Sequence, residues 1–288
     1  MSAETHVKSA ETAAPARTAR REWSGDGGAL QSLREIWEYR ELFYFLAWRD
    51  VKVRYKQTAL GVLWAVIQPF FTMIVFTLLF GRIAKVPTEG IPGPVFYFSA
   101  LLPWIYFSST LNAAGMSLVS NANLLTKIYF PRIILPAASA LSGLVDFLIA
   151  TALLAAMMFY FHIRAGWALL LWPALVVLLV MLTLGVSMFL AAVNVKYRDV
   201  KYAIPFGIQL WLFVTPVIYP SSFVPERFRP LLALNPLTGL IEAFRHSLVP
   251  GRAIDAGALG LSAGLTVVLF LGGAVYFKRV EKDFADII

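Results

Sequence analysis

The sequence predicts an all-α, polytopic membrane protein with six transmembrane helices, and two observations support this prediction. First, 59% of the 288 residues are hydrophobic and 15% are charged, with a mean hydropathy of +0.70. A soluble domain has roughly 45–50% apolar and about 25% charged residues. Second, the chain contains several charge-free segments near the ~20 residues that a helix needs to cross a bilayer. Together these features exclude a soluble globule and a disordered chain.

The N-terminal part divides into a polar tail and a first helix. Residues 1–32 are polar and lack an apolar run, so we expect a disordered cytoplasmic tail. Between 33 and 51, apolar and charged residues separate onto opposite sides of a helix, with several aromatic residues among them. This pattern favours an amphipathic helix in the membrane interface, with a basic lead-in to residue 58, over a helix packed on a soluble core.

The transmembrane domain is expected at 59–277, followed by a cytoplasmic C-terminus at 278–288. The first span has 22 residues, or about 33 Å of helix at ~1.5 Å per residue, which covers a hydrocarbon layer of ~30 Å. The predicted spans are 59–80, 95–118, 139–161, 168–192, 202–219 and 257–277.

Basic residues predict the orientation of these spans. Thirteen Lys and Arg residues lie near the membrane on the side of the termini, against seven on the opposite side. By the positive-inside rule, both termini are therefore expected in the cytoplasm.

The segment 221–255 is the longest connection between the predicted spans. It contains an uncharged run, 230–241, which is interrupted at Asn235 and Pro236. A run of this length is more often re-entrant than spanning. We therefore expect two short re-entrant helices on the outer side, one on each side of Asn235-Pro236, with Phe244 on the apolar side of the second.

Few residues suggest chemistry inside the membrane. Asp146 is the only formal charge between Arg132 and Arg164 and lies within the third span, so it should face the bundle interior or the headgroups. A structural role is favoured over proton coupling, because the other predicted spans hold no titratable partner. The chain has no cysteine, its three histidines lack metal-ligand spacing, and no metal site is predicted.

ATP hydrolysis by this chain is not expected either. The sequence contains no Gly-Lys dipeptide and therefore no P-loop, so ATP-driven work needs a separate subunit.

A basic cluster, Lys52, Arg54 and Lys56, precedes the first span. One interpretation is anchoring by anionic lipid, worth about 1 kcal/mol per basic residue. The other is capture of a phosphorylated lipid headgroup from the inner leaflet. The sequence favours neither.

Four segments together resemble the membrane subunits of ABC-type polysaccharide exporters, the group that handles O-antigen, teichoic acid and capsule. The most specific is RDVKVRYKQTALGVLWAVIQP at 49–69, and its Gln-Thr and Gln-Pro elements lean toward the O-antigen-like branch. The others are NLLTKIYFPR at 123–132, NVKYRDV at 194–200 and LNPLT at 234–238.

This resemblance implies a bacterial inner-membrane permease that is not itself an enzyme. It implies a homodimer with two cytoplasmic ATP-binding subunits, which moves polysaccharide linked to a polyprenyl pyrophosphate. ATP and Mg would bind the partner, with no cofactor in this chain and no nucleic-acid partner. An exporter of small lipids or drugs, or a membrane-embedded polyprenyl-lipid transferase, remains the alternative.

The resemblance also implies roles for particular residues. The loop 121–132 matches a helix that docks on the ATPase, with Asn121, Asn123, Lys127 and Arg132 as coupling residues. The re-entrant helices match an outer gate with Asn235, Pro236 and Phe244. Aromatic residues expected to line the polymer channel are Tyr97, Phe98, Trp104, Tyr106, Phe107, Phe206, Trp211 and Phe213.

Overall fold

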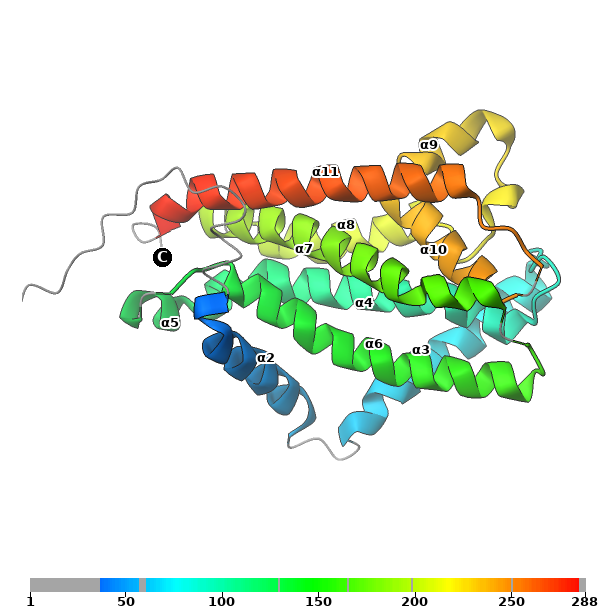
Figure 1. Cartoon of the computed structure of the whole chain (residues 1–288), viewed down its shortest axis with the longest axis horizontal. Helices are drawn as coiled ribbons and strands as arrows, with labels where there is room; N and C mark the ends of the chain where they lie inside the picture. Colours follow the sequence, from blue (N-terminus) through cyan, green and yellow to red (C-terminus); the bar gives the residue numbers. More distant parts are fainter. Residues whose placement is uncertain are drawn as a thin grey trace, which may run out of the picture.

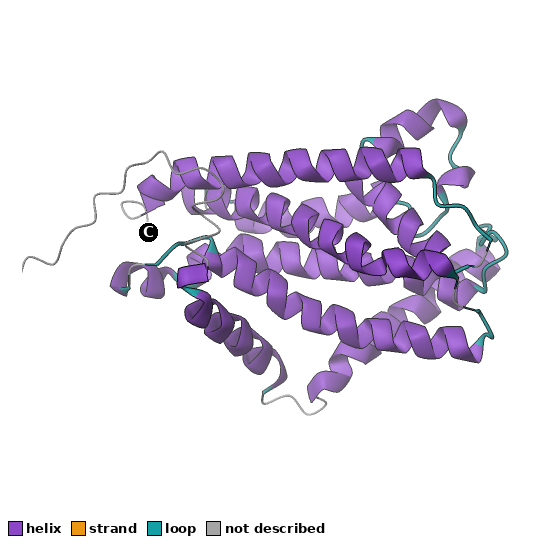
Figure 2. Cartoon of the chain, viewed as in Figure 1, coloured by secondary structure: helices purple, strands orange, loops and turns teal. Residues whose placement is uncertain are grey.

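The computed structural model describes residues 37–56, 61–128, 130–164, 166–197, 199–249 and 251–284. Every regular element within these ranges is helical (Figure 2), which confirms the all-α prediction. The predicted tail at 1–32 and the first residues of the interface helix lie outside the described residues.

The longest helices run side by side along the long axis (Figure 1). Helices α2 and α5 lie at one end of this bundle, which we call the α5 end, and α9 and α10 lie at the other, the α10 end. The helices are α2 (Arg40–Tyr55), α3 (Trp64–Phe76), α4 (Gly93–Ser120), α5 (Ala122–Lys127), α6 (Ile134–Tyr160), α7 (Trp172–Lys196), α8 (Val200–Val214), α9 (Arg229–Ala233), α10 (Pro236–Ser247) and α11 (Ala256–Val280).

Four helical segments among the described residues are long and apolar enough to cross a membrane. They are Gly61–Ile83, Ile134–Tyr160, Trp167–Lys196 and Ala256–Val280, and they overlap the first, third, fourth and sixth predicted spans. The second predicted span coincides with α4, which has 28 residues and no charge but carries several Ser, Thr and Asn side chains that lower its hydropathy. Six spans therefore stay a prediction.

The fifth predicted span, 202–219, was wrong at its end. Helix α8 has 15 residues, or about 22 Å at ~1.5 Å per residue, which is less than a hydrocarbon layer of ~30 Å. It stops at Val214 because Pro216 disfavours helical geometry at the residue before it, and Thr215 is extended with φ −101° and ψ 138°.

The buried apolar residues form two clusters. The larger cluster surrounds α4 and extends to α10. The smaller one lies where Leu118, Phe130 and Ile134, from α4 and the start of α6, meet Phe277 and Phe284 near the end of α11. The α5 end therefore has a core of its own, which joins the chain's last described residues to the loop that carries α5.

Helices α7 and α11 approach each other through glycine. A Cβ atom placed on Gly273 would lie 2.1 Å from the carbonyl oxygen of Gly185. A Cβ placed on Gly185 would lie 2.6 Å from the Cα of Phe270. Small residues allow close helix contact where lipid offers no hydrophobic driving force, so this crossing depends on the absence of both side chains.

The glycine contact gives a stability prediction. Gly273→Ala should lower the free energy of unfolding by about 1–3 kcal/mol, the usual cost of overpacking. Gly272→Ala is the matched control, because its Cβ would meet nothing within 4 Å, and alanine's better helix propensity should raise stability by up to about 1 kcal/mol. Thermal unfolding of the purified protein in detergent measures both. Equal stabilities for the two variants would contradict this packing.

Candidate functional site

The predicted basic cluster on α2 is divided between two sides of the helix. Lys52 and Lys56 are exposed and lie one turn apart, and the Lys52 Nζ is 5.6 Å from the centroid of the Trp48 ring. Arg54 lies on the other side and forms an ion pair with Asp146 of α6. The structure therefore leaves Lys52 and Lys56 facing outward, while Arg54 is engaged within the chain.

Asp146 joins α2 to the middle of α6. One carboxylate oxygen pairs with Arg54, and the other accepts a hydrogen bond from the Tyr55 hydroxyl. Burial and this hydrogen bond raise the pKa of Tyr55. Both partners of Asp146 belong to α2 and neither to another predicted span, which supports the structural role predicted from the sequence.

This pair can be tested against a neighbouring one. The Arg54–Asp146 and Arg49–Asp50 pairs have the same side-chain exposures, 35% and 26%, but only the first joins two helices. Asp146→Asn should therefore cost about 1.5–3 kcal/mol of unfolding free energy, and Asp50→Asn under about 1 kcal/mol. Arg54→Met is then combined with each variant, and the unfolding free energies in detergent give the coupling between Arg54 and Asp146, with Asp50 as the control. Independent effects of Arg54→Met and Asp146→Asn would refute the link.

The four predicted coupling residues do not share one surface. Asn123 and Lys127 are exposed on α5, and Ile128 follows them with half of its surface exposed. Asn121 instead donates its amide to the Ser117 carbonyl at 2.8 Å. Arg132 lies beyond α5 and hydrogen-bonds to Glu281. Asn121 and Arg132 thus bond within this chain, each to a backbone carbonyl near the end of a helix.

The eight predicted channel aromatics differ in burial, and Trp211 on α8 is half-buried. Five of them are buried inside the chain around α4, namely Tyr97, Phe98, Trp104, Tyr106 and Phe107. They pack against other helices; for example, the Phe107 ring centroid lies 5.2 Å from that of Trp211 on α8. Other helices cover them because α4 is buried on all sides from Val95 to Trp104, so their expected place in the polymer channel stays a prediction. On α8, Phe206 and Phe213 are 63% and 59% exposed.

Exposed polar residues that the sequence analysis did not select lie on the second half of α4, on α8 and on α3. Ser109 and Asn112 are exposed on α4, Gln209 is exposed on α8, and Gln68 on α3. The sequence could have indicated these residues, because an uncharged amide inside an apolar segment is costly in lipid unless it has a hydrogen-bond partner.

The predicted gate sequence lies at the α10 end. Short helices α9 and α10 flank Asn235, which matches the expected positions of the two helices. The Asn235 Oδ1 accepts hydrogen bonds from the Leu237 N–H and the Trp211 Nε1, both at 3.1 Å, and its Nδ2 donates to the Thr215 Oγ1 at 2.9 Å. Asn235 therefore caps α10 and ties it to α8.

The other two gate residues support α10 by packing. Pro236 is the first residue of α10, where its missing N–H costs nothing. Phe244 is fully buried, with its ring centroid 5.1 Å from that of Trp172 and 6.3 Å from that of Phe147.

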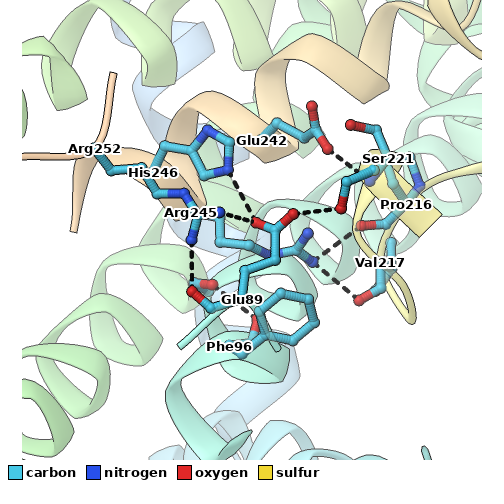
Figure 3. Close-up of polar contacts among 11 residues, drawn as sticks. Glu89, Phe96, Pro216, Val217, Ser221, Glu242, Arg245, His246 and Arg252 are labelled. Atoms are coloured by element: carbon cyan, nitrogen blue, oxygen red, sulfur yellow. Dashed lines mark hydrogen bonds and ion pairs between the residues drawn. The ribbon is translucent and has the colours of Figure 1, made fainter. Parts of the chain in front are cut away.

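A polar network surrounds Glu89 at the same end (Figure 3). The Glu89 carboxylate accepts a hydrogen bond from the Ser222 hydroxyl at 2.5 Å, pairs with Arg252 at 2.5 Å and lies 3.5 Å from the His246 Nε2. Arg252 also donates to the Glu89 backbone carbonyl at 2.9 Å. Glu89 thus joins the loop before α4, the segment after α8, and α10.

Arg245 of α10 is fully buried beside this network. Its Nη2 donates to the carbonyl oxygens of Pro216 and Val217 at 3.0 and 3.2 Å, and its guanidinium carbon lies 3.9 Å from the centroid of the Phe96 ring. Burial lowers its pKa to about 10, so it stays charged at neutral pH. Figure 3 shows this guanidinium between Phe96 and the two carbonyls.

Sequence reasoning missed this network. Arg245 and Arg252 are among the seven basic residues counted on the side opposite the termini, and His246 is one of the three histidines considered only as metal ligands. A weak signal existed in the spacing of Glu242, Arg245 and His246, since residues three or four apart share one side of a helix. The contacts to Glu89 and to the segment after α8 come only from tertiary structure.

Glu89 gives a pH-dependent prediction. Burial alone would raise the pKa of Glu89, but the Ser222 hydroxyl, Arg252 and His246 together lower it below its ordinary value of 4.5. A carboxylate with a lowered pKa stabilises the fold above that ordinary value, and this contribution is lost as the pH falls below it. The stability difference between wild type and Glu89→Gln should therefore be largest near pH 7 and shrink below about pH 4.5. Melting curves from pH 7 to pH 4 measure it; a constant difference would contradict the network.

An all-helical bundle with apolar helices of spanning length defines a multi-pass membrane protein, with the predicted coupling and gate sequences at opposite ends. The ABC-2 type transporter family matches residues 41–249. The chain therefore belongs to the ABC-2 type transporter membrane family.

Curated relatives cover nearly the whole chain. It is 33% identical over 262 residues to the O-antigen export system permease protein RfbA of Myxococcus xanthus, covering 90% of this chain and 100% of that protein. It is 26% identical over 252 residues to RfbA of Klebsiella pneumoniae, with 86% and 95% covered. It is 27% identical over 243 residues to the polysialic acid transport protein KpsM of Escherichia coli, with 81% and 91% covered.

Proposed function

We propose that this chain is the permease subunit of an ATP-driven exporter that moves lipid-pyrophosphate-linked, O-antigen-like polysaccharide across the bacterial inner membrane. One observation carries the proposal: 90% of this chain matches the whole length of an O-antigen export permease. The polysialic acid transport relative extends the same assignment to polysaccharides as a class.

The proposed motor is a separate cytoplasmic ATP-binding subunit, which holds ATP and Mg. The chain has no P-loop sequence of its own. The exposed residues Asn123, Lys127 and Ile128 project from the short helix α5 at one end of the bundle and offer it a docking surface. The excess of basic residues on this side supports a cytoplasmic α5 end, with both termini in the cytoplasm.

The polymer path is proposed to lie between two copies of this chain. Helix α8 is exposed on most of its surface and is shorter than the hydrocarbon layer, so it is poorly suited to stand alone in lipid. The exposed amides of Asn112 and Gln209 would be unsatisfied in hydrocarbon, and a second copy or a hydrated path provides partners. Uncharged hydroxyls and amides can exchange hydrogen bonds along a sugar chain, while Phe206 and Phe213 offer faces for stacking.

The two ends of the path have distinct proposed roles. Lys52 and Lys56 are available for a pyrophosphate headgroup at the α5 end, because Arg54 is already paired with Asp146. At the α10 end, α9 and α10 form the outer gate, whose links to α8 run through Asn235 and Arg245.

Reconstitution tests the function directly. The chain should co-purify with a P-loop ATPase, and proteoliposomes holding both should move lipid-linked glycan only when ATP is supplied. Purified chain that transports the glycan without an ATPase, or a complex that exports a small drug but no glycan, would refute the proposal.

Side-chain variants test the path within the same assay. Asn112→Leu and Gln209→Leu should each lower glycan transport, because they remove polar groups from the polymer surface without adding bulk. Gln209→Asn keeps the amide and should retain most activity. Val268→Leu, at an exposed position on α11, is the control for lipid-facing changes. Full transport by both Leu variants would exclude this surface as the path.

A further inference from the structure

The start of α6 and the end of α11 meet at the α5 end, although 149 residues separate the two points of contact. The backbone N–H of Arg132 donates a hydrogen bond to the Glu281 Oε1 at 3.0 Å. In return, the Arg132 guanidinium donates to the backbone carbonyl oxygen of Glu281. Each side chain therefore bonds to the main chain of the other residue.

This exchange satisfies two helix ends at once. The start of a helix has unpaired N–H groups and a partial positive charge, and its end has unpaired carbonyls and a partial negative charge. Glu281 brings an acidic side chain to the start of α6, and Arg132 brings a cation to the end of α11. Both electrostatic interactions are favourable, and each depends on the other helix staying in place.

Apolar packing shields the contact. Phe284 is 1% exposed, and its ring centroid lies 5.6 Å from that of Phe277. The Arg132 guanidinium carbon lies 5.5 Å from the centroid of the Phe284 ring. Burial raises the pKa of Glu281, and the Arg132 N–H and charge act against that rise. The hydrogen bonds are therefore formed where water competes weakly.

We propose that Arg132 and Glu281 form a clamp that transmits displacement of α5 into α11. The proposal rests on the proposed function, in which an ATPase moves α5. Helix α5 is connected through the chain to α4 and α6, but only through such contacts to α11. Without the clamp, α11 would follow the motor only through apolar packing, on α7 and in the small core around Phe277 and Phe284. Arg132 and Glu281 are thus positioning residues, not docking residues.

Helix α11 can carry this displacement to the gate. Its 25 residues span about 37 Å at ~1.5 Å per residue. Along its length the glycine contact with α7 fixes its position. Near its other end, the Ser262 hydroxyl accepts a hydrogen bond from the Gly239 N–H of α10 at 3.1 Å. One helix therefore links the motor-facing loop to the proposed gate helix.

The test uses the full permease–ATPase complex. Arg132→Met removes the bond from the guanidinium, and Glu281→Met removes the bond to the carboxylate, and each leaves an apolar side chain beside the Phe277–Phe284 contact. The exposed Lys282 supplies the matched control, Lys282→Met. The measured quantity is glycan exported per ATP hydrolysed in proteoliposomes, with the subunit ratio of each purified complex recorded beside it.

Both Met variants should assemble and lower the export ratio at least about fivefold, the low end of coupling between linked sites. The double variant should lower the ratio further than either single one, because each single variant keeps one of the two hydrogen bonds. Lys282→Met should keep the wild-type ratio. Met variants that assemble and keep the wild-type ratio would overturn the clamp.

A reversible cross-link tests the clamp without relying on loss of function. The chain has no cysteine, so Arg132→Cys with Glu281→Cys can be joined by a short thiol-specific linker and released by reductant. The linked complex should regain the export ratio, and reduction of the same sample should lower it again. No change between the two states would also overturn the clamp. A wild-type complex that fails to export glycan would instead refute the proposed function.

Discussion

The bilayer interior cannot solvate polar groups, and the arrangement of this chain follows from that constraint. Polar side chains of the described helices, buried or partly buried, connect elements that are distant in sequence. Asp146 holds Arg54 and Tyr55, and Asn235 holds Trp211 and Thr215. Because leaving such a group unpaired in a low-dielectric region costs more than the bond contributes, these few links fix which helices stay together.

The links are distributed unevenly along the bundle. At the α10 end, Asn235 and Arg245 fasten the end of α8 to α10, and Glu89 adds the loop before α4. At the α5 end, Arg132 and Glu281 fasten α6 to α11. Between the ends, contacts are mostly apolar, although Asn194 donates a hydrogen bond to the Gly115 carbonyl oxygen and the glycine contact holds α11 on α7. The bundle can therefore pass a displacement from one end to the other through α11.

The sequence was sufficient for those features that depend on local composition. Charge-free length located four apolar helices, and α4 and the α9–α10 pair lie where hydropathy and the Asn235-Pro236 break place them. The early end of α8 was readable from Pro216. The sequence could not show which polar side chains bond to one another, because this depends on neighbours in three dimensions. Arg132, for example, faces Glu281 and not the exposed side of α5. The aromatics of α4 could equally have faced a channel or a core, since composition does not say which side of a helix is buried.

The central claim is that the exposed polar sides of α4 and α8 face a second copy and a hydrated path, not lipid. The cysteine-free chain allows a direct measurement: single Cys variants at Asn112 and Gln209, and at Val268 on α11, are treated in native membranes with a water-soluble thiol reagent. The account predicts reaction at Asn112→Cys and Gln209→Cys that increases when ATP drives transport, with Val268→Cys unreactive. Equal protection of all three positions in every state would contradict it.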